Sequence, residues 1–409
     1  MHLLKRLSSI VGCCTLLGAL LPLPAMAMGS KPAKPPEAVP AADLPKDLEV
    51  LLAKTLQDVS ENRLDVAMQD VEAMLRAYPN FRLAHLIRGD LLMAKARPIG
   101  HIGNASGAVQ QIADLRDEIR VRLQYLKEKV PNGRIPKYLL QLQPEQRYAV
   151  VVDTDKARLY LFENHGGEPR YVTDYYVSSG KAGAEKFKEG DQKTPLGVYF
   201  VTSNLPRNQL SDFYGVGAFP ISYPNEWDRK LGKNGHGIWL HGVPSDTYSR
   251  PPRASNGCVV LTNPDMEKLG KNLQIGLTPV IISDRVEWAE PGELASQRGE
   301  LNQALDAWRK DWESLDTDKY LRHYSQSFSA GGQDYRSWAE QKRLVNAGKS
   351  WIKIKVSGVS MFAYPGNNNL VVVTFGQDYG SNNLKNQMRK RQYWQQENGA
   401  WRIVYEGSA

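Results

Sequence analysis

Cys258 is the residue of this chain best suited to covalent chemistry. It ends the segment Ser255-Asn256-Gly257-Cys258, and a histidine, His241, precedes it in a strand-like run. A thiol becomes a strong nucleophile when a nearby base accepts its proton, and a cysteine with a histidine elsewhere in the sequence is typical of such a pair. The sequence therefore predicts that Cys258 is a nucleophile and that His241 is its base.

The turn before Cys258 could supply the other parts of an acyl-transfer site. Gly257 lets the backbone turn sharply, so the amide groups of Gly257 and Cys258 could point together as an oxyanion hole. Ser255 could donate a hydrogen bond to the base, or it could only support the turn, since serine is common in turns. Both roles of Ser255 stay open on the sequence alone.

A second histidine, His236, competes for the role of base. If residues 236–241 form one strand, the odd separation puts His236 and His241 on opposite faces, and only one of them can reach the thiol. Gly242 follows His241 directly and would allow close approach, which favours His241. We expect His236 to be solvated or packed elsewhere.

Two histidines and a cysteine could instead bind zinc. The sequence has no CxxC or HExxH spacing here, and no carboxylate ligand accompanies these residues. We therefore expect no metal and no other cofactor.

The other two cysteines, Cys13 and Cys14, lie in a segment that is typical of a secretory signal peptide. Lys5 and Arg6 precede an apolar run, and Ala25-Met26-Ala27 supplies a small-residue cleavage pattern. A lipoprotein cleavage site at Cys13 is the alternative, with a much shorter apolar core before it. We expect a signal peptide over residues 1–27 and an exported protein of the periplasm or cell envelope, since no later apolar run is long enough to span a bilayer.

Export would leave Cys258 as the one remaining thiol. An unpaired cysteine in an oxidising compartment risks oxidation and mispairing, so its presence suggests a use. A buried, inert cysteine is the alternative. The flanking turn residues favour a reactive one.

The 409 residues, 42% of them hydrophobic, are enough for two or three domains with separate cores. The formal charge of +8 favours an anionic partner such as a cell-wall polymer or a membrane surface, although it could serve only solubility. For an exported protein, nucleic acid is a poor candidate.

Composition and periodicity divide the chain into segments. Residues 28–45 are rich in proline, alanine and lysine and should form a linker. Residues 46–145 carry helical periodicity on both sides of a break at Pro79, as in one tetratricopeptide unit; without a repeat, we expect a small bundle or an arm that could form a homodimer. Residues 146–285 are β-rich. In residues 297–407, helices come before four strands, which predicts an α+β domain with a curled sheet around a pocket.

These motifs together resemble the L,D-transpeptidase family with its YkuD-type catalytic domain. The resemblance covers about residues 147–285 and is carried by the segment 189–199, His241-Gly242 and Ser255-Asn256-Gly257-Cys258. It implies a mostly β fold and a cysteine enzyme that acts on peptidoglycan stem peptides. The cysteine would attack the carbonyl of the diamino acid at position three, expel the terminal D-alanine and form a thioester. An amine would resolve it in transpeptidation, and water in carboxypeptidation.

The resemblance also implies roles for single residues. Cys258 would be the nucleophile, His241 the base, and the carbonyl of Gly242 a support for the imidazole. The positions that match the substrate groove are Tyr223, Trp239, Arg250 and Asn256. Many members of the family have Arg or Asn two residues after the cysteine, where this chain has Val260. That departure leaves hydrolysis open.

The three-part layout resembles the cell-shape L,D-carboxypeptidases, which end in an NTF2-like domain. Residues 297–407 would be that domain, with a core of cone aromatics at Trp308, Tyr320, Tyr324, Phe328 and Trp338. We expect it to bind a partner without doing chemistry and to be dispensable for activity on small substrates. A basic run, Lys385, Arg389, Lys390 and Arg391, could attract an anionic glycan or could simply be solvated.

We therefore expect a multidomain protein with a helical N-terminal region, a mostly β YkuD-type domain and an α+β NTF2-like domain. Three functions fit this layout. They are a peptidoglycan L,D-transpeptidase that transfers to an amine, an L,D-carboxypeptidase that trims tetrapeptides to tripeptides, and a non-catalytic wall-binding scaffold.

Overall fold

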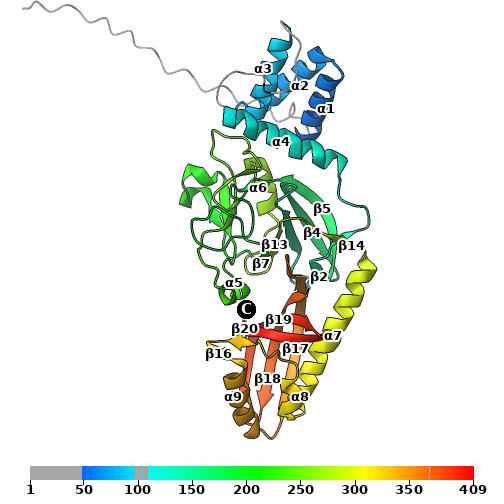
Figure 1. The fold of residues 1–409 in the computed structure, drawn as a ribbon, viewed down its shortest axis with the longest axis vertical. Helices are drawn as coiled ribbons and strands as arrows, with labels where there is room; N and C mark the ends of the chain where they lie inside the picture. Colours follow the sequence, from blue (N-terminus) through cyan, green and yellow to red (C-terminus); the bar gives the residue numbers. More distant parts are fainter. Residues whose placement is uncertain (1–47, 96–102, 104–108, 368) are drawn as a thin grey trace, which may run out of the picture. The chain divides into compact units, whose positions relative to one another are not determined.

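The computed structural model describes residues 48–95, 103, 109–367 and 369–409 (Figure 1). The expected signal peptide at 1–27 and linker at 28–45 lie outside these residues. Within them, no helix is long and apolar enough to cross a membrane.

The N-terminal region is helical. Its helices are α1 (Leu48–Ser60), α2 (Leu64–Ala77), α3 (Arg82–Ala94) and α4 (Val109–Lys127). The apolar positions that recur along α2 face inward, because Ala67, Val71 and Met74 are fully buried. They pack against Phe81, which begins the turn into α3, and against the buried face of α3. The helix pair predicted on either side of Pro79 is confirmed.

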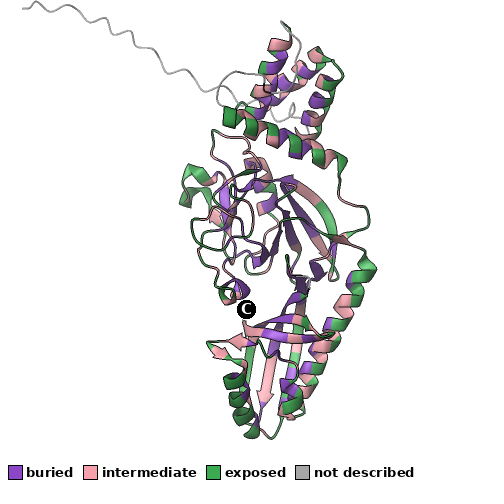
Figure 2. Cartoon of the chain, viewed as in Figure 1, coloured by how far each residue is buried: buried purple, intermediate pink, exposed green. Residues whose placement is uncertain are grey.

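The middle region is β-rich, as predicted. One sheet has the strand order β5-β4-β3-β13-β7. Its strands are β3 (Tyr148–Asp153), β4 (Arg158–His165), β5 (Glu168–Tyr176), β7 (Gly197–Phe200) and β13 (Pro279–Ser283). Figure 2 shows buried residues concentrated along these strands. They pack against α6 (Asn263–Gly270), whose Met266 and Leu269 are buried in the same core.

A second sheet carries the candidate catalytic residues. Its strand order is β12-β10-β9-β8, with β8 (Leu205–Pro206), β9 (Gly217–Pro220), β10 (Trp239–His241) and β12 (Val259–Val260). Strands β10 and β12 are parallel, with Leu240 opposite Val259 and His241 opposite Val260. Cys258 directly precedes β12, so this register puts it opposite Trp239, on the face of the sheet that also carries His241.

Short elements accompany the two sheets. They are β1 (Ile135–Pro136), β6 (Ser179–Gly180), α5 (Glu226–Lys230), β11 (Arg253–Ser255) and β14 (Trp288–Ala289). Strand β11 pairs in parallel with β6, which holds the segment before Cys258 against the loop that follows β5.

The C-terminal region is a long antiparallel sheet with helices. Its elements are α7 (Pro291–Glu313), α8 (Thr317–Leu321), β15 (Ser329–Ala330), β16 (Gln333–Asp334), α9 (Tyr335–Ala347), β17 (Ile352–Ala363), β18 (Leu370–Ser381), β19 (Lys385–Glu397) and β20 (Ala400–Ser408). Leu305, Trp308 and Trp312 recur at helical spacing along α7 and are all buried. The expected aromatic core is also buried, at Trp308, Tyr320, Tyr324, Phe328 and Trp338.

The catalytic and C-terminal regions share one apolar core. Strand β2 (Leu139–Gln141), which precedes the catalytic sheet in sequence, pairs with β17 at the edge of the C-terminal sheet. Phe200 and Phe362 lie with ring centroids 6.2 Å apart, and Arg391 Nη1 contacts Glu226 Oε1 at 3.0 Å. Removal of the C-terminal domain would therefore expose apolar side chains of the catalytic region to water, which argues against the expectation that this domain is dispensable.

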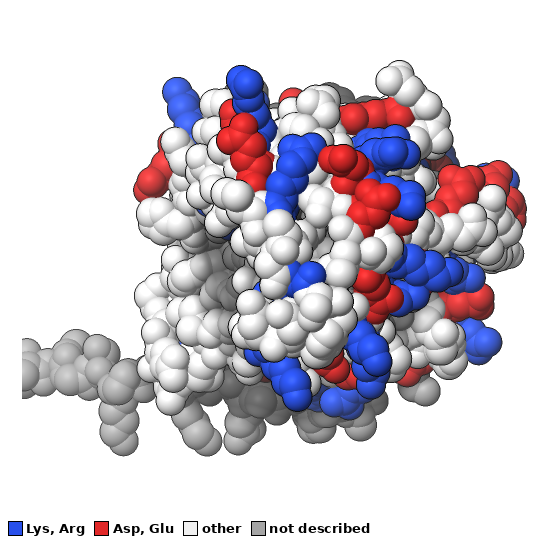
Figure 3. All heavy atoms as spheres, turned by 90° about the horizontal axis from the view of Figure 1, so that it is seen from below, with Lys and Arg blue, Asp and Glu red and all other residues white. Residues whose placement is uncertain are grey.

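The basic run on β19 is largely used inside the protein. Lys390 is buried and its Nζ contacts Glu406 Oε1 at 2.9 Å, while Arg391 pairs with Glu226. Lys385 is exposed and lines a cavity of about 900 Å³ on the sheet, together with Lys353 and Tyr379. Figure 3 shows basic side chains interspersed with acidic ones on the face that it draws. The idea of a free basic patch is wrong for Lys390 and Arg391.

Candidate active site

Cys258 is a free, half-buried thiol directly before β12. Its Sγ lies 3.4 Å from the carbonyl oxygen of Gly237. The turn before it is held by Ser255, whose Oγ donates to the carbonyl of Cys258 at 2.6 Å and accepts from the Gly257 N–H at 3.0 Å. Of the two roles left open for Ser255, these contacts match support of the turn.

The amide of Gly257 is consequently occupied. An oxyanion hole made jointly by the amides of Gly257 and Cys258, as expected from the sequence, would need the hydrogen bond between Gly257 and Ser255 to break first. The expectation is wrong for the Gly257 amide in the conformation seen here.

Gly257 is required at its position for two reasons. Its φ of +123° lies in a region that L-residues rarely adopt, and an added Cβ would lie 2.7 Å from the carbonyl oxygen of Lys193. Thr194 Oγ1 also donates to the carbonyl of Gly257 at 3.0 Å. The turn that presents the thiol is thus packed directly on the segment 189–199 that the sequence analysis singled out.

Asp191 organises that segment. Its Oδ1 accepts from Lys186 Nζ at 2.7 Å and from the Lys193 N–H at 3.1 Å, and its Oδ2 accepts from the N–H of Phe187 at 2.8 Å. Burial alone would raise the pKa of Asp191, but Lys186 and these amide donors outweigh it and lower the pKa to about 2. The carboxylate is therefore ionised at any physiological pH.

His241 is almost fully buried, and its Nδ1 lies 2.6 Å from the carbonyl oxygen of Gly242. A carbonyl can only accept, so Nδ1 carries the proton and Nε2 is left as the acceptor in the neutral ring. Burial lowers the pKa of His241 to about 4; the Gly242 hydrogen bond opposes this, and the charge of Arg250 adds to it. At neutral pH the imidazole is uncharged and can take a proton.

The thiol is uncharged at rest as well. Burial raises the pKa of Cys258 above its ordinary value, although a backbone hydrogen bond from Trp239 and the charges of Arg250 and Lys186 act in the opposite direction. The site thus holds a neutral thiol and a neutral imidazole, and a thiolate forms only when the proton moves during the reaction.

Aromatic rings enclose the imidazole. The ring of Tyr214 lies 5.1 Å and that of Phe213 5.9 Å from His241, and Tyr214 also packs on Trp239 at 4.7 Å. The guanidinium of Arg250 lies 4.8 Å from the Phe213 ring centroid. Of the expected substrate residues, Trp239 and Arg250 are therefore grouped with His241.

The other two expected substrate residues are placed differently. Tyr223 is buried in the core, and its hydroxyl donates to the carbonyl of Asn234 at 2.8 Å. Asn256 is exposed at the tip of the turn before Cys258. Val260 is buried, opposite His241 in the sheet, so a charged side chain at this position would need a partner of its own.

His236 lies at the surface, with 79% of its side chain exposed and Nδ1 3.6 Å from Glu189 Oε1. The argument that residues 236–241 form one strand, with His236 and His241 on opposite faces, is wrong. Strand β10 covers only Trp239–His241, and the backbone bends at Gly237, with φ of +73°. Strand alternation does not apply to an irregular segment, even though His236 is solvated as expected.

Sequence reasoning missed Lys186, Phe213 and Tyr214. Lys186 lies in an irregular segment, and Phe213 and Tyr214 lie in a single 3-10 turn, Asp212–Tyr214. Such segments are too short for helical or strand periodicity to mark a residue that faces the site. Among the described residues, no group of His, Cys, Asp and Glu side chains could hold a metal ion.

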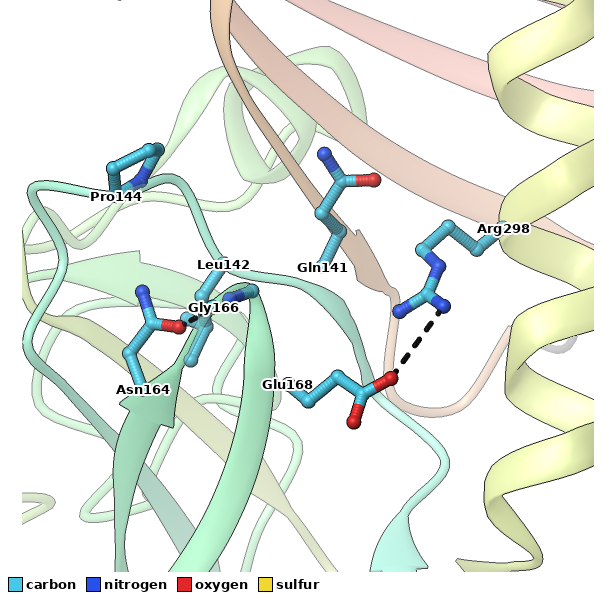
Figure 4. Close-up of a pocket in the computed structure, with 8 residues that line it drawn as sticks. Gln141, Leu142, Pro144, Asn164, Gly166, Glu168 and Arg298 are labelled. Carbon is cyan, nitrogen blue, oxygen red and sulfur yellow. Dashed lines mark hydrogen bonds and ion pairs between the residues drawn. The ribbon is translucent and has the colours of Figure 1, made fainter.

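A separate cavity of about 520 Å³ lies between the β4–β5 hairpin, β2 and α7 (Figure 4). Arg298 and Glu168 face each other across it, with 3.9 Å between Nη2 and Oε1. None of the residues expected in catalysis lines this cavity.

Comparison with known proteins agrees with this layout. Residues 147–282 match the family model of the L,D-transpeptidase catalytic domain, YkuD, and residues 300–407 match that of the Cds6 C-terminal NTF2-like domain. No curated protein matches the chain significantly.

Two solved structures share the architecture. Bd1075 from Bdellovibrio bacteriovorus is 30% identical, with a TM-score of 0.59, over 68% of this chain and 98% of that one. The helical cell shape determining protein Pgp2 from Campylobacter jejuni is 25% identical, with a TM-score of 0.57, over 71% of this chain and 99% of that one. The chain therefore belongs to the L,D-transpeptidase (YkuD) family of peptidoglycan enzymes, in the branch that ends in an NTF2-like domain.

Proposed function

We propose that the protein is a cysteine acyltransferase that cleaves the peptide bond before the terminal D-alanine of peptidoglycan stem tetrapeptides. The observation that carries this proposal is a free thiol at Cys258 on the same sheet face as a neutral His241 whose Nε2 can accept a proton. These are the two groups that a thioester mechanism needs.

The first half-reaction transfers the acyl group to sulfur. Cys258 gives its proton to Nε2 of His241 as Sγ attacks the carbonyl carbon of the third residue. The resulting imidazolium then protonates the departing nitrogen of D-alanine as the C–N bond breaks. The products are a thioester on Cys258, free D-alanine and a neutral His241, so protons and electron pairs balance.

The second half-reaction decides between two enzymes. An amine from a neighbouring stem would give a cross-link, and water would give a tripeptide. In both cases His241 takes the acceptor's proton as the new C–N or C–O bond forms, and it returns that proton to Sγ of Cys258 as the thioester C–S bond breaks. Val260 supports hydrolysis as the second candidate, because this buried apolar residue stands where many family members carry Arg or Asn. The similarity to Pgp2, described as a cell shape determining protein, supports a role in cell shape.

The test is to incubate the purified protein with tetrapeptide muropeptides and to read the products by mass. Tripeptides with free D-alanine indicate hydrolysis, and cross-linked dimers or exchange of the terminal amino acid indicate transfer. The Cys258→Ala variant is the control. Products that are equally abundant with this variant would move the nucleophile to another residue. No products from the unmodified chain would leave the wall-binding scaffold as the remaining function.

We also propose that the chain is exported and cleaved after Ala27. The signal-like segment at residues 1–27 and a peptidoglycan-directed catalytic domain support this location. Mass analysis of the protein from fractionated cells gives the N-terminus directly. A mature form that retains Met1, or one that starts with a lipidated Cys13, would contradict it.

A further inference from the structure

The loop of residues 243–252 links the two halves of the proposed active site. It leaves His241-Gly242 at the end of β10 and enters β11, which runs into the turn that presents Cys258. The loop also carries Arg250, whose guanidinium lies over Phe213 beside the imidazole. The conformation of this loop therefore sets the position of the Arg250 guanidinium relative to His241.

The tip of this loop is anchored in the N-terminal helical region. The ring of Tyr248 lies 4.4 Å from that of Tyr78 and 4.6 Å from that of Phe81, and it packs with the buried core of α1, α2 and α3. Asn80 Nδ2 donates to the carbonyl of Ser245 at 3.1 Å. The turn between α2 and α3 thus forms an aromatic notch, made by Tyr78 and Phe81, that receives Tyr248.

A second anchor comes from α4. Ser249 Oγ donates to Glu118 Oε1 at 2.7 Å, and this fully buried carboxylate pairs with Arg122 Nη2 at 2.8 Å. The guanidinium of Arg122 lies 3.7 Å from the ring centroid of Tyr176.

Tyr176 continues this chain of contacts to the active site. Its hydroxyl donates to the carbonyl of Arg250 at 2.8 Å. Residues 248–250 are consequently held at three successive positions, through the ring of Tyr248, the hydroxyl of Ser249 and the carbonyl of Arg250. Two of these three contacts come from the helical region.

We propose that the helical region acts as a positioning element for catalysis, with Tyr248 as the positioning residue that seats Arg250 beside Cys258 and His241. The inference rests on the proposed function for the identity of the reacting pair. It adds that the N-terminal helices, which carry none of the proposed catalytic groups, help to set the rate of the catalytic domain.

The position of the Arg250 charge can be measured separately from the packing of the loop, through the pH dependence of Cys258 alkylation. The charge of Arg250 favours the thiolate of Cys258. Loosening the loop moves that charge away, so the midpoint of the pH profile for alkylation of Cys258 by iodoacetamide shifts to higher pH. Removing the charge with Arg250→Ala gives the reference shift.

The experiment compares Tyr248→Ala with Tyr248→Phe in the full chain. We expect Tyr248→Ala to lose about 10- to 100-fold in kcat/KM, since a displacement of about 1 Å can cost about 100-fold, and to move the alkylation midpoint toward that of Arg250→Ala. Tyr248→Phe keeps the ring in the notch and should match the unmodified chain in both measurements. Ser249→Ala, a milder change, should move both in the same direction by less.

Three outcomes separate the ideas. The inference fails if Tyr248→Ala has a lower Tm while the pH midpoint for alkylation of Cys258 is unchanged in both Tyr248→Ala and Ser249→Ala. Tyr248 would then only stabilise the fold. An equal loss in Tyr248→Phe would contradict the role of the ring. Failure of the proposed function gives different results: the unmodified chain has no turnover, or the Cys258→Ala variant has full turnover. The pH midpoint for alkylation of Cys258 can be measured in either case, so the two failures can be told apart.

Discussion

Lys186 and Asp191 form a buried ion pair, with 2.7 Å between Nζ and Oδ1, in the loop that packs beneath the catalytic turn. Removing one partner of such a pair leaves the other as an uncompensated charge. The loop in turn contacts the turn through Thr194 and Gly257. A charge pair outside the reacting groups therefore supports the geometry of the thiol.

Asp191→Asn should destabilise the protein in a pH-dependent way. The folded-state pKa of about 2 is below the ordinary 3.8, so the carboxylate stabilises the fold above about pH 4, and this contribution is lost as pH falls through about 2. The difference in free energy of unfolding between the unmodified chain and Asp191→Asn should be constant near neutral pH and shrink below about pH 4. Asp246→Asn, which removes a charge at an exposed carboxylate, is measured beside it as the control.

Cys258→Ala should abolish turnover and thioester formation, because no other group supplies the covalent step. The side chain is small and half-buried, so the free energy of unfolding should change by about 1 kcal/mol or less. Product mass and intact-protein mass check the two parts. Turnover of the alanine variant at more than a few per cent of the original rate would move the nucleophile to another residue.

His241→Ala should lower the rate by about 100- to 10,000-fold, the usual range for a general base, and His236→Ala should have little effect at the exposed position. Because the pKa of His241 is about 4, kcat/KM should fall only as pH drops toward that value and should be flat around pH 6. The pH profile and the two variants are measured together. A rate that titrates near pH 6.5 would contradict a buried, neutral base.

Gly257→Ala should inactivate and destabilise the protein, by about 1–3 kcal/mol from backbone strain alone, with an added clash against Lys193. Gly166→Ala is a matched control: its φ is also positive, at +67°, but open space surrounds the added Cβ. Gly166→Ala should lower the free energy of unfolding through backbone strain but leave kcat/KM unchanged. Equal effects on kcat/KM in the two variants would show that the packing of Gly257 on Lys193 is unimportant.

Phe362→Ala should destabilise the catalytic and C-terminal regions together, by about 3–5 kcal/mol, because its ring is fully buried against Phe200 in their shared core. Leu384→Ala, at a side chain that is 52% exposed, should change stability by about 0.5 kcal/mol or less. Calorimetry should give one transition for both regions. Separate transitions, with only the later one shifted by Phe362→Ala, would mean that the two regions fold independently.

The sequence predicted the elements whose own periodicity marks a buried face. Helix α7 is one example, since Leu305, Trp308 and Trp312 recur at helical spacing and are buried together. The start of strand β17 is another, because Ile352 and Ile354 are buried while Lys353 and Lys355 between and after them are exposed. Residue type and order along the chain also singled out Cys258 and His241, and the register of β10 and β12 places these two proposed catalytic residues on one face of the sheet.

Contacts between distant segments had no such signal. The occupied amide of Gly257, the pairing of Arg391 with Glu226 and the notch around Tyr248 each depend on where another part of the chain folds. The strand at His236 was overpredicted because an apolar run with histidines at both ends resembles a strand until a glycine bends it. Local patterns report which face is buried and do not report what covers it.

The pairing of β2 with β17 joins two strands that lie far apart in the sequence. Gln141 Nε2 donates to the carbonyl of Val359 across 218 positions, and Tyr138, Leu139, Leu140 and Leu142 are buried around this contact. A ribosome delivers residues in order, so this apolar segment emerges long before its partner strand and stays uncovered until β17 has been made. Only a full-length chain can close the edge. A molecule cut short before β17 keeps an apolar segment without its partner strand, and such an open strand edge is prone to aggregate.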